Sequence, residues 1–267
     1  MELIHLPEPS LLFNHGQATE DPRDGLTLFG PLDKGRPYGI RGGVIGTRDG
    51  IRRFKNWLVS IQCPVSNNPP QTARPPFPGF EAAFGIPWCS DPVQEIVIDD
   101  AELRTKYLID DRHQRIFHTV DLYASRIDSS TDEDSAVDLW FVVVPDDVHK
   151  YCRPQSVVEA SVRINAPDRM SVREAKGLLN APTLFDDWNV AAEPYHFDVN
   201  FHNQLKARLL GKRMITQVIR ESTIAHRDFL DPYGNPLRDL DALQSAIAWH
   251  LSTVVFYVTL HPFAGIA

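Results

Sequence analysis

The stretch VDLWFVVVP at residues 137–145 sets the strongest limit on the fold of this chain. It is a continuous apolar run, rich in β-branched and aromatic residues, and it ends at Pro145 with two aspartates after it. A strand with one solvent-facing side alternates apolar and polar residues, whereas a strand that is buried on both faces does not. The run therefore predicts a central strand of a parallel sheet, with helices packed on both faces.

Strand and helix patterns alternate along much of the remaining chain, as such a sheet requires. Residues 38–47 predict a strand that leads into an amphipathic helix at 48–61, and residues 94–99 predict another strand. The other expected elements are helices at 112–127, 171–179, 200–210 and 238–258 and a strand at 213–220. The predicted fold class is α/β: a Rossmann-like, open and mostly parallel sheet with flanking helices.

Two segments rich in proline or glycine do not fit this alternation. Residues 1–37 contain short apolar pieces between Pro, Gly and Asp, so we expect an extended N-terminal arm that lies against something else. Residues 62–93 contain NNPP and RPPFPGF and predict a loop over the surface.

The acidic composition narrows the classes of function. The 267 residues carry a formal charge of −8, which argues against a generic, charge-driven nucleic-acid coat. It does not argue against a local anion pocket, because the local field decides binding there. The three cysteines are far apart and support neither a disulfide scaffold nor a CxxC zinc site.

The sequences near both ends of the chain are used to predict the cellular location of the protein. The N-terminal sequence lacks the basic region and the long apolar run of a secretory signal. The apolar run AIAWHLSTVVFYVTL near the C-terminus is shorter than the ~20 residues that span a bilayer, so a buried helix is favoured. We expect a cytoplasmic protein without a membrane partner.

Sequence motifs of nucleotide binding and nucleophilic catalysis are missing. The glycines of IRGGVIG do not make GxGxxG, and there is no Walker-type phosphate loop, no GxSxG elbow and no HExxH zinc motif. His196, Asp198 and His202 are close in sequence, but Asp198 is placed to cap the helix at 200–210. Capping and packing are therefore favoured over metal binding.

Asp146 and Asp147 follow the carboxyl end of the central strand, which is where open α/β sheets bind ligands. A small-molecule α/β enzyme that uses this edge is one functional alternative. A loop or capping role is the favoured interpretation of the two aspartates, because no phosphate loop or nucleophile motif accompanies them.

The stretch FHNQLKARLLGKRMITQVIR at 201–220 gathers positive charge without a single acid. His202 and Lys206 are four residues apart and share one face of the predicted helix, and Gln217 lies on the strand that returns from this helix. An imidazole, an ammonium and an amide that converge at the edge of an α/β sheet hold a phosphate through charge-assisted hydrogen bonds.

The remaining cations of this stretch extend the hypothesis. Arg208, Lys212 and Arg213 are placed as contacts to a nucleic-acid backbone beyond the phosphate. The alternative is an ordinary helix that buries its leucines and keeps its cations in water.

Six short segments resemble landmarks of short prokaryotic Argonaute proteins, and they occur in the order of that family. They are DPRDGLTLFGP (21–31), IRGGVIGTRDGIRRFKNWL (40–58), FPGF (77–80), DLWFVVVPDDV (138–148), DVNFHNQLKARLLGKRMITQVIREST (198–223) and LQSAIAWHLSTVVFYV (243–258).

The resemblance implies a MID domain, which in this family is Rossmann-like and holds the 5′-phosphate of a guide strand. The family pocket uses a Tyr or His, a Lys four residues later, a Gln on the following strand and a further Lys. His202, Lys206 and Gln217 match the first three positions. Val258 takes the place of the further lysine, and the loss of one charge-assisted contact is expected to weaken binding by about 1.5–3 kcal/mol. Some members hold Mg²⁺ at this phosphate, so Mg²⁺ is the one cofactor that the resemblance implies.

The resemblance also implies a domain organisation. We expect an arm at 1–37, a MID-like domain at 38–260 and a lead-in to a PIWI-like domain at 261–267. The catalytic acids of slicing relatives lie in the PIWI domain, so we expect a non-slicing protein rather than an enzyme.

The expected partners follow from prokaryotic immunity, in which short family members act. They are a guide RNA or DNA, its complementary target strand, and an effector-bearing protein of the APAZ type, such as a TIR or SIR2 fusion, or a separate PIWI half. The alternative is a catalytically silent interaction subunit, which the valine at position 258 favours.

Overall fold

The computed structural model describes residues 10–33, 37–65, 75–130, 137–154, 161, 163–164, 166–180, 190–224 and 240–260. The chain divides into two compact units. One, called the sheet unit here, comprises residues 42–54 and 93–224, and the second unit comprises residues 1–41, 55–92 and 225–267. The predicted range 38–260 thus contributes to both units, and the predicted lead-in at 261–267 lies outside the described residues.

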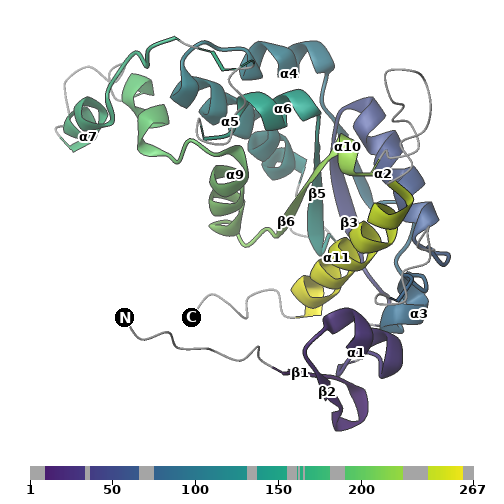
Figure 1. Cartoon of the computed structure of the whole chain (residues 1–267). Coiled ribbons are helices and arrows are strands. Elements are labelled where there is room, and N and C mark those ends of the chain that lie inside the picture. The colour runs from purple at the N-terminus through teal and green to yellow at the C-terminus, as the bar shows by residue number, and fades with distance from the viewer. Residues whose placement is uncertain are drawn as a thin grey trace, which may run out of the picture. The chain divides into compact units, whose positions relative to one another are not determined.

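A parallel sheet with the strand order β4-β3-β5-β6 forms the centre of the sheet unit (Figure 1). The strands span Gly42–Gly46 (β3), Gln94–Val97 (β4), Leu139–Val144 (β5) and Thr216–Arg220 (β6). All three pairings between neighbouring strands are parallel. The Rossmann-like parallel α/β fold that the sequence predicts is confirmed.

Strand β5 is buried along its whole length, as its continuous apolar sequence predicts. On one face of the sheet, the Phe141 ring lies 4.7 Å from the Phe54 ring of α2 (Arg48–Ser60). On the other face, Trp140 and Val142 belong to a large core cluster. A polar residue on either side of β5 would be cut off from water, which explains why the sequence does not alternate.

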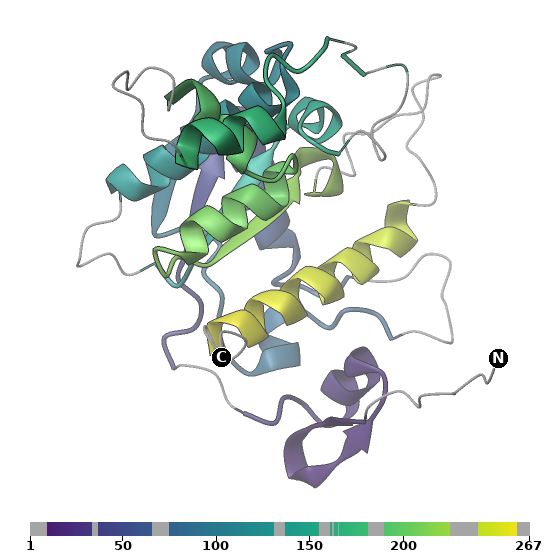
Figure 2. The ribbon, with the colours of Figure 1, turned by 90° about the vertical axis from the view of Figure 1, so that its left-hand side faces the viewer.

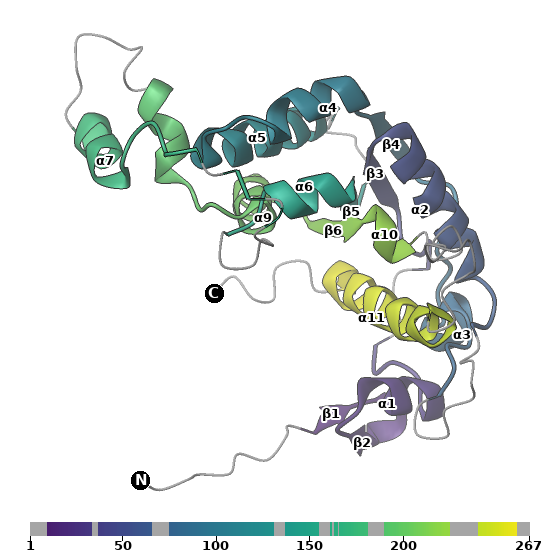
Figure 3. The ribbon, with the colours of Figure 1, turned by 45° about the horizontal axis from the view of Figure 1, so that its top comes forward.

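Helices pack on both faces of the sheet (Figures 1 and 3). Helix α2 covers one face, and the other carries α4 (Asp100–Tyr107), α5 (Arg112–Ser130) and α9 (Phe201–Leu210), whose apolar residues share the core cluster. Short helices continue directly from two strands: α6 (Asp146–Tyr151) from β5 and α10 (Glu221–Ile224) from β6.

Helices α4 and α6 were not predicted. The sequence at 100–107 has little amphipathic periodicity, and this helix depends on its cap, because the Asp99 carboxylate accepts a hydrogen bond from the Glu102 N–H at 3.0 Å. Helix α6 begins at the two aspartates after β5, where acidic residues favour a helix N-terminus.

The segment between β5 and β6 contains the predicted helix at 171–179, observed as α7 (Val172–Asn180). A capping box begins it: the Ser171 hydroxyl accepts from the Glu174 N–H, and the Glu174 carboxylate accepts from the Ser171 N–H at 2.8 Å. A 3-10 turn, η3 (Glu193–His196), packs against α7 through Tyr195.

The second unit contains folded structure where an extended arm was expected. Residues 11–28 form β1 (Leu11–Leu12), η1 (Asn14–Gly16), β2 (Ala18–Thr19) and α1 (Pro22–Leu28). The Asp21 carboxylate caps α1 by accepting from the Arg23 N–H at 2.8 Å, and the proline at the first helical position fixes its start. Phe13 and Leu26 are buried, so the segment has its own apolar contacts.

Residues 75–92 also belong to a core and are not a surface loop. They include α3 (Phe80–Phe84), and the Phe77 ring packs edge-on against Trp249 of α11 (Leu240–Leu260) at 5.1 Å. The Trp249 indole donates to the Pro75 carbonyl at 3.2 Å. Among the described helices, α11 included, none is long and apolar enough to cross a membrane.

Candidate anion-binding site

Helix α9 positions two of the predicted phosphate ligands. The Asn200 side chain caps it by accepting from the His202 N–H at 3.1 Å. Asp198, the predicted cap, instead accepts from the Asn203 amide at 2.9 Å. Leu205 and Leu209 are buried against the sheet, so His202 and Lys206 lie together on one partly buried flank of the helix.

The chain brings a third basic side chain to this flank. The Phe201 N–H donates to the Cys152 carbonyl at 3.0 Å, and this bond holds the residues after α6 against the start of α9. The positive charge of Arg153 acts on His202 from there. Burial, and then the charges of Lys206 and Arg153, lower the pKa of His202. Burial also lowers the pKa of Lys206.

Two further basic residues complete the group, which we call the cationic cluster: His149, Arg153, His202, Lys206 and Arg220. The Arg153 guanidinium lies 3.0 Å from His149 Nε2. Arg220 ends β6 next to Val144 of β5, and burial, Arg220 and Arg153 together lower the pKa of His149 to about 4. The cluster therefore draws on α6, α9 and the carboxyl end of β6, which Figure 2 shows at one side of the sheet.

The cationic cluster has little negative charge to balance it. Among the described residues, no carboxylate lies within ion-pair distance of Arg153, Lys206 or Arg220. The one acid that acts on His149 is Asp146, and its carboxylate already accepts a hydrogen bond from the Ser222 hydroxyl at 2.6 Å. Arg220 is exposed, but Arg153 and Lys206 are partly buried, and unpaired positive charge is costly there. The cluster is therefore suited to an anion.

Gln217 does not join this cluster. Its neighbour Val218 packs into the core cluster that contains Leu205 of α9. Because side chains alternate along a strand, Gln217 faces the opposite side of the sheet, in register with Phe141. Its amide donates to the Val218 carbonyl at 3.2 Å.

The three residues predicted to contact a nucleic-acid backbone, Arg208, Lys212 and Arg213, do not join the cationic cluster either. Arg208 Nη2 lies 2.5 Å from Asp121 of α5, and Lys212 Nζ lies 2.6 Å from Asp128 of the same helix. Arg213 is exposed and has a positive φ of 59°, which turns the chain from α9 toward β6. Arg208 and Lys212 are thus neutralised within the chain and connect two helices.

Val258, the residue that the resemblance aligns with a pocket lysine, lies partly buried on α11 of the second unit.

His149, Arg153 and Arg220 were not predicted as ligands. Residues at or after the carboxyl ends of β5 and β6 lie at the ligand edge of a parallel sheet, and this rule is the signal that could have pointed to them.

At the carboxyl edge of the sheet, side chains of the protein also interact with one another after β3 and β6. The Thr47 hydroxyl accepts from the Gly50 N–H at 2.9 Å, which caps α2, and it donates to the Glu221 carboxylate at 2.7 Å. In doubly wound sheets a ligand phosphate often occupies this helix start. Here the Glu221 carboxylate is hydrogen-bonded beside this helix start, and burial raises the pKa of its carboxyl. Asp147 interacts with Lys150 at 3.7 Å.

The donor set does not fit a metal ion. Mg²⁺ prefers carboxylate and carbonyl oxygens, whereas the cationic cluster offers mainly nitrogen donors that carry or acquire positive charge. No group of three His, Cys, Asp or Glu side chains suited to a metal occurs in the described part of the chain, and His196, Asp198 and His202 do not form one. The cationic cluster therefore does not supply the oxygen ligands that Mg²⁺ requires.

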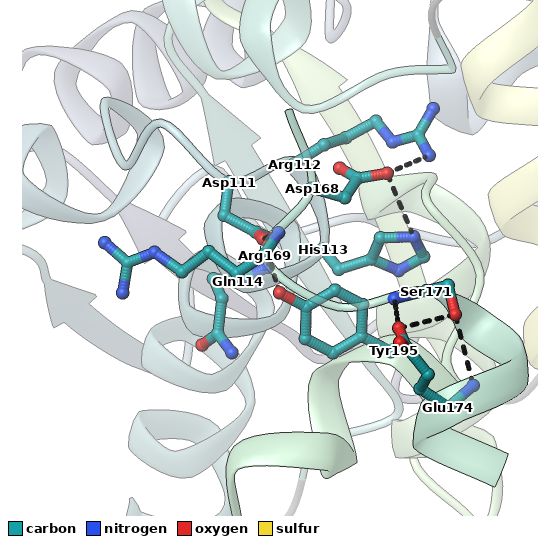
Figure 4. Close-up of polar contacts among 9 residues, drawn as sticks. All are labelled: Asp111, Arg112, His113, Gln114, Asp168, Arg169, Ser171, Glu174 and Tyr195. Atoms are coloured by element: carbon teal, nitrogen blue, oxygen red, sulfur yellow. Dashed lines mark hydrogen bonds and ion pairs between the residues drawn. The ribbon is translucent and has the colours of Figure 1, made fainter. Parts of the chain in front are cut away.

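A separate polar network holds the start of α5 (Figure 4). The buried Asp111 carboxylate accepts hydrogen bonds from the Gln114 N–H at 3.0 Å, the Arg169 N–H at 2.7 Å and the Tyr195 hydroxyl. His113 packs against the Tyr195 ring at 4.8 Å and lies 3.9 Å from Asp168. Asp111, His113 and Tyr195 are all buried, so they serve to fix the segment around α7 to α5.

Comparison of the sequence with protein-family models and with curated proteins gives no match to either.

Proposed function

We propose that the cationic cluster binds the 5′-phosphorylated end of a nucleic-acid strand. The observation that carries this proposal is the convergence of Arg153, Lys206 and Arg220 without a carboxylate partner among the described residues of an acidic chain. A terminal phosphate carries a charge of about −1.5 to −2 at neutral pH and presents three acceptor oxygens, which suits several donors around one point.

The proposal extends to a biological role through the resemblance to short Argonaute proteins. In that role the chain is a MID-type, non-slicing subunit of a prokaryotic defence system, and the strand is a guide RNA or DNA that pairs with a target. An effector-bearing APAZ-type protein or a separate PIWI half is the proposed protein partner. The Rossmann-like parallel fold and the matches at His202 and Lys206 support this role.

A binding experiment tests the phosphate site directly. Short single strands of identical sequence, with and without a 5′-phosphate, are titrated against the full chain and its Lys206→Met variant. We expect the phosphate to tighten binding, and the variant to lose about 10- to 100-fold for the phosphorylated strand only, because one charge-assisted contact is worth about 1.5–3 kcal/mol.

Lys106→Met is the matched control, because Lys106 is also partly buried but belongs to α4. This control is expected to bind both strands as the wild type does. Equal affinity of the wild-type chain for both strands would reject the phosphate site and favour a silent interaction subunit. Tight binding of a nucleotide or metabolite without strand binding would favour a small-molecule enzyme.

A further inference from the structure

The contact between Arg153 and His149 fixes the protonation state of the imidazole. Arg153 Nη1 lies 3.0 Å from His149 Nε2, and a guanidinium group only donates hydrogen bonds. Arg153 Nη1 also lies 3.4 Å from His149 Nδ1. Whichever ring nitrogen meets the guanidinium must therefore accept with its lone pair. The hydrogen bond exists only while His149 is neutral.

The surroundings of His149 keep it neutral in the free protein. Arg153 follows α6, Arg220 comes from β6, and Asp146 of α6 itself is the one opposing charge. Burial acts in the same direction as the two arginines, and the pKa of His149 falls to about 4. His202 has a similar setting, since burial, Lys206 and Arg153 all lower its pKa.

A phosphate in the cluster reverses this balance. Its two negative charges offset the charges of Arg153 and Arg220, so the protonated imidazole is no longer repelled. A proton taken from solvent onto the accepting ring nitrogen then removes the acceptor that holds Arg153. The guanidinium and the new ring N–H are both left as donors to the same anion.

We propose that His149 holds Arg153 in the free protein and that protonation of His149 releases Arg153 to bind the phosphate, so the cluster takes up a proton together with its ligand. The inference rests on the phosphate site proposed above and adds His149 to it as a positioning residue.

The direction in which anion binding depends on pH follows from the pKa of His149 in the free protein and in the complex. The pKa of His149 is about 4 in the free protein and is higher in the complex. Protonation of His149 therefore strengthens anion binding fully at a pH below the pKa that His149 has in the free protein. This strengthening disappears as the pH rises through the pKa of His149 in the complex. Between about pH 8 and pH 5, where histidines titrate, binding is expected to tighten as the pH falls.

Inorganic sulfate is the first probe, because it stays a dianion over this range, whereas a phosphate monoester itself titrates near pH 6. Calorimetric titration of the full chain in two buffers of different ionisation enthalpy counts the protons bound with sulfate. The wild type is expected to take up as much as about one proton more than His149→Gln near pH 5, and to gain about 3- to 10-fold more affinity from pH 8 to pH 5.

Glutamine at position 149 keeps an oxygen acceptor for Arg153 but does not titrate. His118→Gln is the matched control, since His118 of α5 is another partly buried imidazole with a lowered pKa, with Lys106 and Asp121 as its charged neighbours. The control is expected to show wild-type proton uptake. If His149→Gln does not fold, NMR titration of the His149 ring in the wild type, with and without sulfate, measures the same linkage.

The same variant pair is then measured with the 5′-phosphorylated strand, so that titration of the ligand cancels. Proton uptake that is identical in the wild type and in His149→Gln, or a His149 pKa that sulfate does not raise, overturns the inference while leaving the phosphate site intact. Failure of the phosphate site itself has a different signature, because the wild type would then not distinguish the phosphorylated strand from the unphosphorylated one at any pH.

Discussion

Gly50 of α2 lies next to the carboxylate of Glu221. A Cβ atom at this position would lie 2.7 Å from Glu221 Oε1 and 3.1 Å from both Thr47 Oγ1 and Val143 Cγ1. The hydrogen bond between Thr47 and Glu221 and the packing of α2 on β5 depend on this close approach.

A Gly50→Ala substitution tests this close approach. Alanine favours a helix by about 1 kcal/mol over glycine, but here the methyl group meets Glu221 and the sheet, and overpacking costs about 1–3 kcal/mol. We expect a net loss of stability in urea unfolding. Gly177 of α7 is the control, because nothing lies within 4 Å of its added Cβ, and Gly177→Ala should stabilise. Stabilisation by both substitutions would contradict the packing at Gly50.

The individual members of the cationic cluster were the hardest part of the candidate site to predict. His202 and Lys206 could be placed side by side because residues four apart on a helix are neighbours regardless of the fold. The side of the sheet that Gln217 faces depends on strand register, and a shift of one residue reverses it. Arg153 reaches the cluster through the hydrogen bond between Phe201 of α9 and Cys152, and Arg220 through the pairing of β6 with β5, and neither contact can be read from local sequence.

The start of α5 shows how one side chain orders a whole element. Asp111 is 1% exposed and accepts hydrogen bonds from α5, from the segment before α7 and from η3. Burial alone would raise the pKa of Asp111, but the hydrogen bonds from Arg169, Gln114 and Tyr195 outweigh it, and the pKa is lowered.

Removal of this carboxylate should therefore cost more than removal of an ordinary helix cap. Asp111→Ala is expected to lower the free energy of unfolding by about 2–4 kcal/mol, since it leaves buried donors unpaired. Asp99→Ala, at the exposed cap of α4, should cost about 1 kcal/mol. Urea unfolding measures both, and equal losses would show that the network adds nothing to the cap.

The pH dependence of Asp111→Asn has a defined sign. Because the folded pKa is lowered, the ionised carboxylate stabilises the fold above its unfolded pKa of 3.8, and this contribution is lost as the pH falls through the folded pKa. The stability difference between the wild type and Asp111→Asn should therefore shrink in acid below about pH 4.

Elements with a strong local signal were predicted well. Strand β5 was evident from its apolar run and α5 from its helical spacing, and both are confirmed. Helices α1 and α4 were missed because their signals are caps, Asp21 with Pro22 and Asp99, and not periodicity. Residues 75–92 were predicted as a surface loop because prolines are typical of loops. The phenylalanines among them are nevertheless buried in the second unit.

The distribution of charge over the whole chain limits the length of nucleic-acid strand that the protein can bind. The net charge is −8, and Arg208 and Lys212 are paired with aspartates of α5. The cationic cluster is thus the expected contact, and the rest of a long strand should gain little from this chain.

This distribution predicts a weak dependence on strand length. A 5′-phosphorylated tetranucleotide should bind within about tenfold of a strand of about 20 nucleotides, with a salt slope on the order of −1 to −2, since each contacted phosphate of a single strand contributes about −0.7. Fluorescence anisotropy at several salt concentrations measures both. A steep slope and a large gain for the longer strand would restore the predicted backbone contacts of Arg208, Lys212 and Arg213.

The strand order also determines when the cationic cluster forms. Gly42 pairs with Leu139 and Trp140 with Thr216, so each of these pairings closes a long stretch of chain. Sheets built from such distant partners fold slowly, because the entropy of loop closure is lost before the contacts form. A ribosome that makes this chain must release Arg220 before the cluster is complete, so ligand binding during synthesis begins only after nearly all of the sheet unit has emerged.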